Sequence, residues 1–196
     1  MGKLTSDNDG ARPALGRAFL SRLGQAKLPG ARAQVVFWSV SILGVAADLW
    51  TKSAAFNWLE QQPDQRFSVI DGFLYLVMAL NDGAAFNMFA GHSAWLTAVS
   101  VAAMVAILAI FLLGGGQHKL MPFALGFFAG GVCGNLYDRL FNGGLVRDFI
   151  DVVYWPGKHW PAFNVADSML CVAVGLLIIS SLFSPKSSQT RARQRK

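Results

Sequence analysis

The chain has 196 residues, of which 54% are hydrophobic and 14% are charged, and its net charge is +6. Average soluble domains carry about 25% charged residues, so this composition excludes an ordinary soluble domain. It predicts a protein that is integral to a membrane. The two cysteines, Cys133 and Cys171, lie inside apolar stretches and lack the spacing of metal ligands or of a disulfide framework.

Four segments have the length and apolar character of membrane-spanning helices, which need about 20 mostly apolar residues. The segments cover about 34–50, 93–113, 120–140 and 165–183. We therefore expect an all-α membrane protein with four transmembrane helices.

Basic residues gather at both ends of the chain and predict its orientation. Six Lys and Arg residues precede Gln34, and five more lie between Lys186 and Lys196. Cytoplasmic flanks of membrane spans carry an excess of Lys and Arg, so both termini are expected in the cytoplasm. Basic tails next to apolar spans favour anchoring at anionic lipid over nucleic-acid binding. The expected division is a tail at 1–33, a four-span catalytic domain at 34–184 and a second tail at 185–196.

The outward-facing loops carry signals of their own structure. Residues 66–70 and 74–80 are short β-like runs separated by the turn signal Asp71-Gly72. They predict a small extracytoplasmic β-sheet cradle. Residues 55–62 predict a short interfacial helix. Further along, His159 lies in what resembles a variable loop from 154 to 161, and we expect it to be merely exposed.

Polar residues interrupt the third predicted span near its outer end. Asn135, Asp138 and Arg139 share one helical face there. An ionisable group at membrane depth costs about 2.5–3.5 kcal/mol on insertion scales, so it needs a partner or a function. One alternative is that Asp138 and Arg139 only lock the helix register. Small residues spaced for close helix packing precede them at Gly126, Gly130 and Gly134.

Two further segments bring polar groups to the same outer level, and each has a purely structural interpretation. Asp48 and Lys52 end the first span four residues apart, the spacing of an ordinary surface ion pair. Asn81, Asp82 and Gly83 precede the second span and read more readily as a hairpin turn than as a contact site.

The fourth span begins with a similar ambiguity. Asn164 and Asp167 stand three residues apart at a helix start, which is the pattern of an N-cap with an acidic first-turn partner. That interpretation does not explain why Asp148, which follows the third span, should arrive at the same level. Convergence of these acids is what favours a functional site.

At this point the residues resemble the lipoprotein signal peptidase (signal peptidase II) family. The matching strings occur in the family's order over about residues 46–184. They are Ala47-Asp48 with Thr51-Lys52, Asn81-x-Gly83-Ala84-Ala85-Phe86, Gly134-Asn135-x-x-Asp138-Arg139, Val146-x-Asp148-Phe149 and Phe163-Asn164-x-Ala166-Asp167-Ser168.

The resemblance implies an aspartic endopeptidase of the bacterial inner membrane. Such an enzyme removes signal peptides from diacylglyceryl-modified prolipoproteins, cutting before the lipid-bearing cysteine. By residue-for-residue match, Asp148 and Asp167 are the catalytic pair. Globomycin-like cyclic peptides are the implied inhibitors. The residues implied to line or support the pocket are Asp48, Lys52, Asn81, Gly83, Asn135, Asp138, Arg139, Asn164 and Ala166.

Two carboxylates in close contact share one proton, which lets the pair act as both acid and base. Asp167 lies in the predicted first turn of a helix, whose dipole favours its anion, so Asp148 is expected to hold the proton more often. No metal or other cofactor is expected, and we expect a monomer. A proton-coupled transporter and a structural membrane subunit are the alternative functions.

Overall fold

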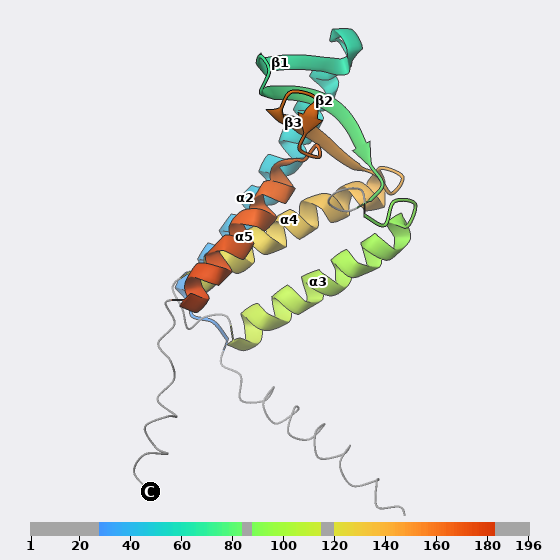
Figure 1. The fold of residues 1–196 in the computed structure, drawn as a ribbon. Coiled ribbons are helices and arrows are strands. Elements are labelled where there is room, and N and C mark those ends of the chain that lie inside the picture. Colours follow the sequence, from blue (N-terminus) through green and yellow to red (C-terminus); the bar gives the residue numbers. More distant parts are fainter. Residues whose placement is uncertain (1–27, 84–87, 115–119, 183–196) are drawn as a thin grey trace, which may run out of the picture.

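The structure, a computed structural model, describes residues 28–83, 88–114 and 120–182 (Figure 1). Its helices are α2 (Ala31–Leu59), α3 (Ser93–Gly114), α4 (Met121–Phe141) and α5 (Val165–Leu182). A 3-10 turn, η1 (Pro63–Gln65), precedes the strands β1 (Arg66–Ile70), β2 (Leu74–Asn81), β3 (Val146–Trp155) and β4 (Lys158–His159). Most of both predicted tails and the motif residues 84–86 lie outside the described residues.

The apolar helices confirm a membrane protein, with one qualification about the number of spans. Among the described residues, α2, α3 and α5 are long and apolar enough to cross a membrane. The predicted third span forms α4, which is 21 residues long. Its glycines and its polar residues near the C-terminal end lower its hydropathy, so α4 does not qualify by composition. A fourth transmembrane helix therefore stays a prediction.

The predicted interfacial helix at 55–62 is wrong as a separate element. Residues 55–59 form the last turn of α2, which runs unbroken for 29 residues. Because the sequence from Thr51 to Leu59 contains neither proline nor glycine, nothing ends the helix earlier. The helix stops only before η1, which has proline in its first turn.

The β-sheet is larger than the sequence predicted. β1 and β2 match the predicted strands at 66–70 and 74–80, and β3 and β4 extend the sheet in the antiparallel order β1-β2-β3-β4. The variable loop expected at 154–161 is therefore wrong in part, because it contains the end of β3 and all of β4. The sheet sits at one end of the helices, where α2 and α4 end and α3 and α5 begin (Figure 1).

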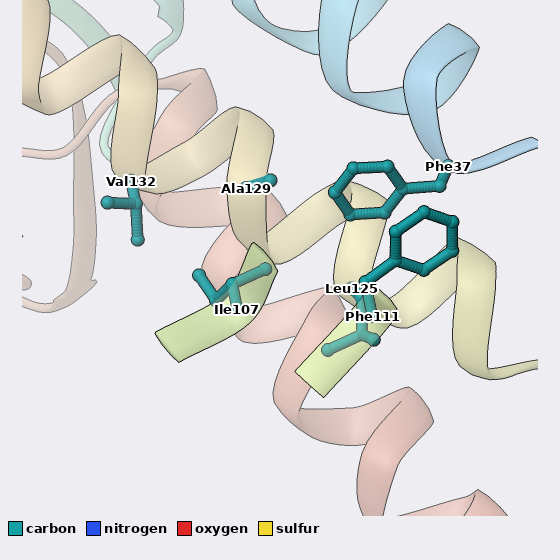
Figure 2. Close-up of a cluster of buried hydrophobic side chains, with 6 residues drawn as sticks. All are labelled: Phe37, Ile107, Phe111, Leu125, Ala129 and Val132. Atoms are coloured by element: carbon teal, nitrogen blue, oxygen red, sulfur yellow. The ribbon is translucent and has the colours of Figure 1, made fainter. Parts of the chain in front are cut away.

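Helix α4 is the centre of the bundle and contacts α2, α3 and α5. Its first half packs in an apolar cluster with α2 and α3, in which the rings of Phe37 and Phe111 stack with centroids 4.0 Å apart (Figure 2). The cluster consists of Phe37, Ile107, Phe111, Leu125, Ala129 and Val132. This cluster leaves the other half of α4, toward the sheet, free for polar residues.

Glycines on α4 allow two helices to approach it closely. At Gly126, a Cβ atom would lie 3.0 Å from the Phe37 carbonyl oxygen of α2. At Gly131, a Cβ atom would lie 2.6 Å from the Ala166 carbonyl oxygen and 2.8 Å from Leu170 Cγ, both of α5. The predicted small-residue face is confirmed, and Gly131 adds a further close approach to α5.

We predict that Gly131→Ala destabilises the protein. The backbone of α5 cannot yield as a flexible side chain would, and overpacking of this kind costs about 1–3 kcal/mol. Thermal unfolding in detergent should show the melting temperature falling by several degrees. Gly175→Ala on α5 is the matched control, because a Cβ there meets nothing within 4 Å. Equal losses in the two variants would contradict the close-packing argument.

Candidate active site

The first turn of α5 is closed by a reciprocal pair of hydrogen bonds. The Asp167 N–H donates to Asn164 Oδ1 (3.0 Å), and the Asn164 N–H donates to Asp167 Oδ2 (3.1 Å). This is the geometry of a capping box, and it satisfies two backbone donors that the helix itself cannot. The N-cap interpretation is therefore confirmed. It also fixes the Asp167 carboxylate at the end of the bundle that faces the sheet.

The same asparagine reaches the second acid. Asn164 Nδ2 donates to Asp148 Oδ1 (2.6 Å), so one fully buried side chain is bonded to both aspartates. The other oxygen of Asp148, Oδ2, accepts a hydrogen bond from Asn81 Nδ2 (3.0 Å). Asn81 is the last residue of β2 and pairs with Val146 of β3, which brings its amide to the strand that carries Asp148.

Asn81 and Gly83 also form the turn that the sequence suggested. Asn81 Oδ1 accepts the Gly83 N–H (2.9 Å) while the amide nitrogen of the same side chain holds Asp148. The Asn81 side chain therefore forms the turn and contacts the candidate site at the same time. Arg139 contacts this turn as well, because its Nη2 donates to the Gly83 carbonyl oxygen (3.1 Å).

A second amide, Asn135 on α4, ties the acids to the bundle. Its Nδ2 donates to Asp167 Oδ1 (2.8 Å). Its Oδ1 accepts from Asn164 Nδ2 (3.1 Å) and from Lys52 Nζ (2.9 Å). Each polar atom of the Asn135 amide is thus used, which is what a buried amide requires.

Lys52 is fully buried and lies between two carboxylates. Its Nζ is 2.7 Å from Asp48 Oδ2 and 3.2 Å from Asp138 Oδ2, and the side chains of both acids are also fully buried. The surface ion pair considered for Asp48 and Lys52 is therefore wrong. The pair is buried because α2 packs against α4 at this level, where Gly134 makes room: a Cβ there would collide with Asp48 Oδ2.

Asp48 also explains why Ala166 belongs to the site. Asp48 Oδ1 accepts the Ala166 N–H (2.8 Å), one of the free backbone donors in the first turn of α5. The bond joins α2 directly to the helix that carries Asp167. Ala166 therefore contributes through its backbone, and its fully buried methyl group leaves no space for a larger side chain.

Asp138 has a partner that the sequence did not single out. Arg147 donates to Asp138 Oδ1 through Nε (3.1 Å) and Nη2 (2.7 Å), and its backbone N–H donates to Asp138 Oδ2 (3.0 Å). The structural alternative for Asp138 and Arg139 is compatible with these contacts, because Asp138 binds Arg147 and Lys52 while Arg139 binds the Gly83 carbonyl oxygen. Position 147 falls on an unassigned position between Val146 and Asp148 in the family motif, which is why it was missed.

Burial and charge act together on Asp148. Its side chain is almost completely buried, and removal from water raises the pKa of Asp148 to about 7, with the nearby charge of Asp167 adding to the rise. The hydrogen bonds from Asn81 and Asn164 act in the opposite direction. A carboxyl group with such a pKa can hold or release a proton near neutrality.

His159 is exposed, as predicted, but it is not isolated. Its Nδ1 lies 2.9 Å from Asp151 Oδ1, and Arg66 Nη2 lies 3.3 Å from Asp151 Oδ2. This cluster connects β1, β3 and β4 within the sheet. The structure does not bring it into the network around Asp148 and Asp167, so these three residues are placed outside the candidate site.

Apolar membrane-length helices that enclose a buried network of acids and amides at one end define an integral membrane protein with a polar site. Comparison with known proteins then identifies the family. The profile described as Signal peptidase (SPase) II matches residues 40–183. The chain belongs to the signal peptidase II family, whose members are membrane proteases that cleave signal peptides from prolipoproteins.

Curated relatives agree with this assignment. The lipoprotein signal peptidase of Rhodopirellula baltica is 37% identical over 161 residues, covering 74% of this chain and 71% of the relative. That of Francisella tularensis subsp. novicida is 33% identical and covers 80% and 98%. That of Ralstonia nicotianae is 40% identical and covers 73% and 82%.

Two solved structures share the fold. Both are described as bacterial membrane enzymes studied by the in meso method. One, at 2.3 Å resolution, is 26% identical with a TM-score of 0.69 and covers 84% of this chain and 99% of its own. The other, at 1.9 Å resolution, is 27% identical with a TM-score of 0.67 and covers 82% and 99%.

We predict that Lys52→Met destabilises the protein strongly. Removing one partner of a buried ion pair costs about 3–5 kcal/mol, and here two buried carboxylates, Asp48 and Asp138, lose their shared cation. Chemical unfolding in a mild detergent should report the loss. Lys158→Met, at an exposed lysine of β4, serves as the control and should change stability little. The burial argument fails if the two substitutions cost the same.

Proposed function

We propose that this chain is an aspartic endopeptidase in which Asp148 and Asp167 form the catalytic pair. The observation that carries the proposal is the shared asparagine: Asn164 donates to Asp148 Oδ1 (2.6 Å) and exchanges backbone hydrogen bonds with Asp167. One fully buried side chain therefore sets the position of both carboxylates. Membership of a family of prolipoprotein signal peptidases supplies the substrate class.

The proposed reaction uses a water molecule between the two acids. The ionised carboxylate takes a proton from water, whose oxygen attacks the scissile carbonyl carbon, while the protonated acid donates a hydrogen bond to the carbonyl oxygen. The tetrahedral intermediate then collapses. The C–N bond breaks, and a proton passes from the pair to the departing amine. The pair ends with one proton, as it began.

The contacts favour Asp148 as the acid that starts with the proton. Burial opposes its anion, and the charge of Asp167 opposes it further. Both acids accept a hydrogen bond on each oxygen, but only Asp167 lies in the first turn of α5. A helix N-terminus favours a carboxylate anion. The assignment agrees with the expectation from the sequence.

The proposed substrate is a prolipoprotein whose cysteine already carries diacylglyceryl, cut on the N-terminal side of that cysteine. Exposed apolar side chains cover the outer faces of α2 and α3, including Val35, Ile42, Leu43 and Val105. A substrate helix and its acyl chains can lie in lipid beside such faces, where burial contributes about 0.8 kcal/mol per CH₂. Globomycin-like cyclic peptides would compete for the same site.

The proposal includes a topology. Four spans, with α4 as the third, place both termini in the cytoplasm and the sheet end of the bundle at the outer leaflet of the bacterial inner membrane. The basic residues at the chain ends support this orientation. A single copy of the chain holds both acids and their amide partners, which supports a monomeric enzyme.

We predict that Asp148→Asn and Asp167→Asn each abolish cleavage, lowering turnover by about 10³-fold or more, while the protein stays folded. Neither amide can replace the ionised or the proton-donating carboxyl group. The measurement is turnover of a purified diacylglyceryl prolipoprotein in detergent, with thermal unfolding recorded in parallel.

The control for this experiment is Asp151→Asn, a buried aspartate three positions along the same strand that pairs with Arg66 and His159. It should keep most of its turnover. Cleavage near the wild-type rate in a folded Asp148→Asn or Asp167→Asn protein would refute the dyad. In that case the proton-coupled transporter would become the stronger interpretation of the two acids.

We predict that turnover falls as the pH rises through about 7. The pKa of Asp148 is raised to about 7 by burial and by Asp167, so above that value the pair loses its last proton. An unprotonated pair can still take a proton from water but cannot donate a hydrogen bond to the carbonyl oxygen. The kcat profile from pH 5 to 9 tests this, and a profile that stays flat or rises across neutrality would contradict the assignment.

A further inference from the structure

Arg147 is held at every polar group that it offers to the site. Its guanidinium donates to Asp138 Oδ1 through Nε (3.1 Å) and Nη2 (2.7 Å), and its Nη1 donates to Ser53 Oγ (3.3 Å). Its backbone N–H donates to Asp138 Oδ2 (3.0 Å), and its carbonyl oxygen accepts from Asn164 Nδ2 (3.3 Å). From the second position of β3, Arg147 therefore connects α2, α4 and the N-cap of α5.

The backbone contacts matter because Asp148 is the next residue. The peptide units on both sides of the Arg147 Cα are fixed, one by Asp138 and the other by Asn164. Asn164 also holds the Asp148 carboxylate itself. The hydrogen bonds between Arg147 and Asp138 therefore help to set the direction of the Asp148 side chain.

Charge balance gives the side chain a second effect. The buried group Asp48, Lys52 and Asp138 contains two carboxylates and one ammonium, which leaves an excess of one negative charge. Arg147 supplies the second cation, and its side chain is 20% exposed where the others are fully buried. Without it, Lys52 alone would neutralise both acids. Lys52 also donates to Asn135 Oδ1, and Asn135 in turn holds Asp167.

Asp138 therefore reaches both acids of the proposed pair by separate routes. One runs through the Arg147 backbone to Asp148, and the other runs through Lys52 and Asn135 to Asp167. We propose that Arg147 is a positioning residue that fixes the separation of Asp148 and Asp167. It does so in two ways: its bonds to Asp138 hold β3 against α4, and its charge completes the balance around Lys52. This inference rests on the proposed function, because it gives the pair its geometry.

The test is the kinetics of two variants of the full-length protein in detergent with the diacylglyceryl prolipoprotein. Arg147→Met removes the cation and the donors. We expect kcat to fall about 10–100-fold, as when a positioning contact around a reactive centre is lost, with KM within about threefold of wild type. Arg147→Lys keeps the charge and loses the forked geometry, so its kcat should lie between those of the wild type and Arg147→Met.

A pH profile distinguishes positioning from general stability. The charged groups that face Asp148 are Asp167 of α5, Lys52 of α2 and Arg139 of α4, and Arg147 acts on this set through Asp138. Loss of a neighbouring cation favours protonated carboxyl groups, so the decline in kcat should move to higher pH in Arg147→Met. Arg147→Lys should keep the wild-type profile. A variant that is only less stable would lose amplitude at every pH without a shift.

The matched control is Arg66→Met, which breaks another arginine–aspartate pair of the same sheet, with Asp151 at 3.3 Å, outside the candidate site. It should keep the wild-type kcat and profile. If Arg147→Met does not fold, Arg147→Lys decides the matter alone, because its expected loss of kcat arises from geometry. Wild-type kcat in folded Arg147→Lys and Arg147→Met, or an equal loss in Arg66→Met, overturns the inference. Asp148→Asn activity reports separately on the proposed function.

Discussion

The structure depends on one buried cation. Lys52 touches Asp48, Asp138 and Asn135, and through them it joins α2, α4 and the first turn of α5. A lysine without contact with water is tolerated only where carboxylates and hydrogen-bond acceptors surround it. Meeting that requirement forces three helices to converge at one level. The two acids of the candidate site lie at this level because their own partners, Asn135 and Asn164, belong to the same network.

Much of this arrangement could be predicted from the sequence, because local patterns and site residues coincide. The cap formed by Asn164 and Asp167 is a standard helix start, and the same asparagine also bonds Asp148. Asn81 forms a turn with Gly83 and holds Asp148 with its other amide atom. At such positions the structural interpretation and the functional one were posed as alternatives. The structure shows the cap or turn and the contact with Asp148 in one side chain, since a side-chain amide has a donor and an acceptor that can serve different partners.

What the sequence did not provide was the long-range pairing. β3 is rich in β-branched and aromatic residues, yet the acids at 148 and 151 disguised its pattern, and its neighbour β2 lies more than sixty positions earlier. Arg147 was missed because its position is unassigned in the family motif and because its partner lies on another element. Nothing in its immediate surroundings indicates that Asp138, on the preceding helix, receives three of its donors. The continuation of α2 to Leu59 was also missed, because the lack of a helix-breaking residue is a weaker sequence signal than a proline or a glycine.

The lower hydropathy of α4 and the presence of a site are consequences of the same residues. Its glycines admit α2 and α5 at close range, and Asn135 and Asp138 occupy the turns where those helices carry Lys52 and the N-terminus of α5. A helix with these residues would be costly to place alone among lipid. Surrounded by α2, α3 and α5, its polar groups face partners instead of hydrocarbon. The central helix can therefore carry glycines and buried polar residues, because α2, α3 and α5 pack against it and the polar residues find their partners on these neighbours and on β3.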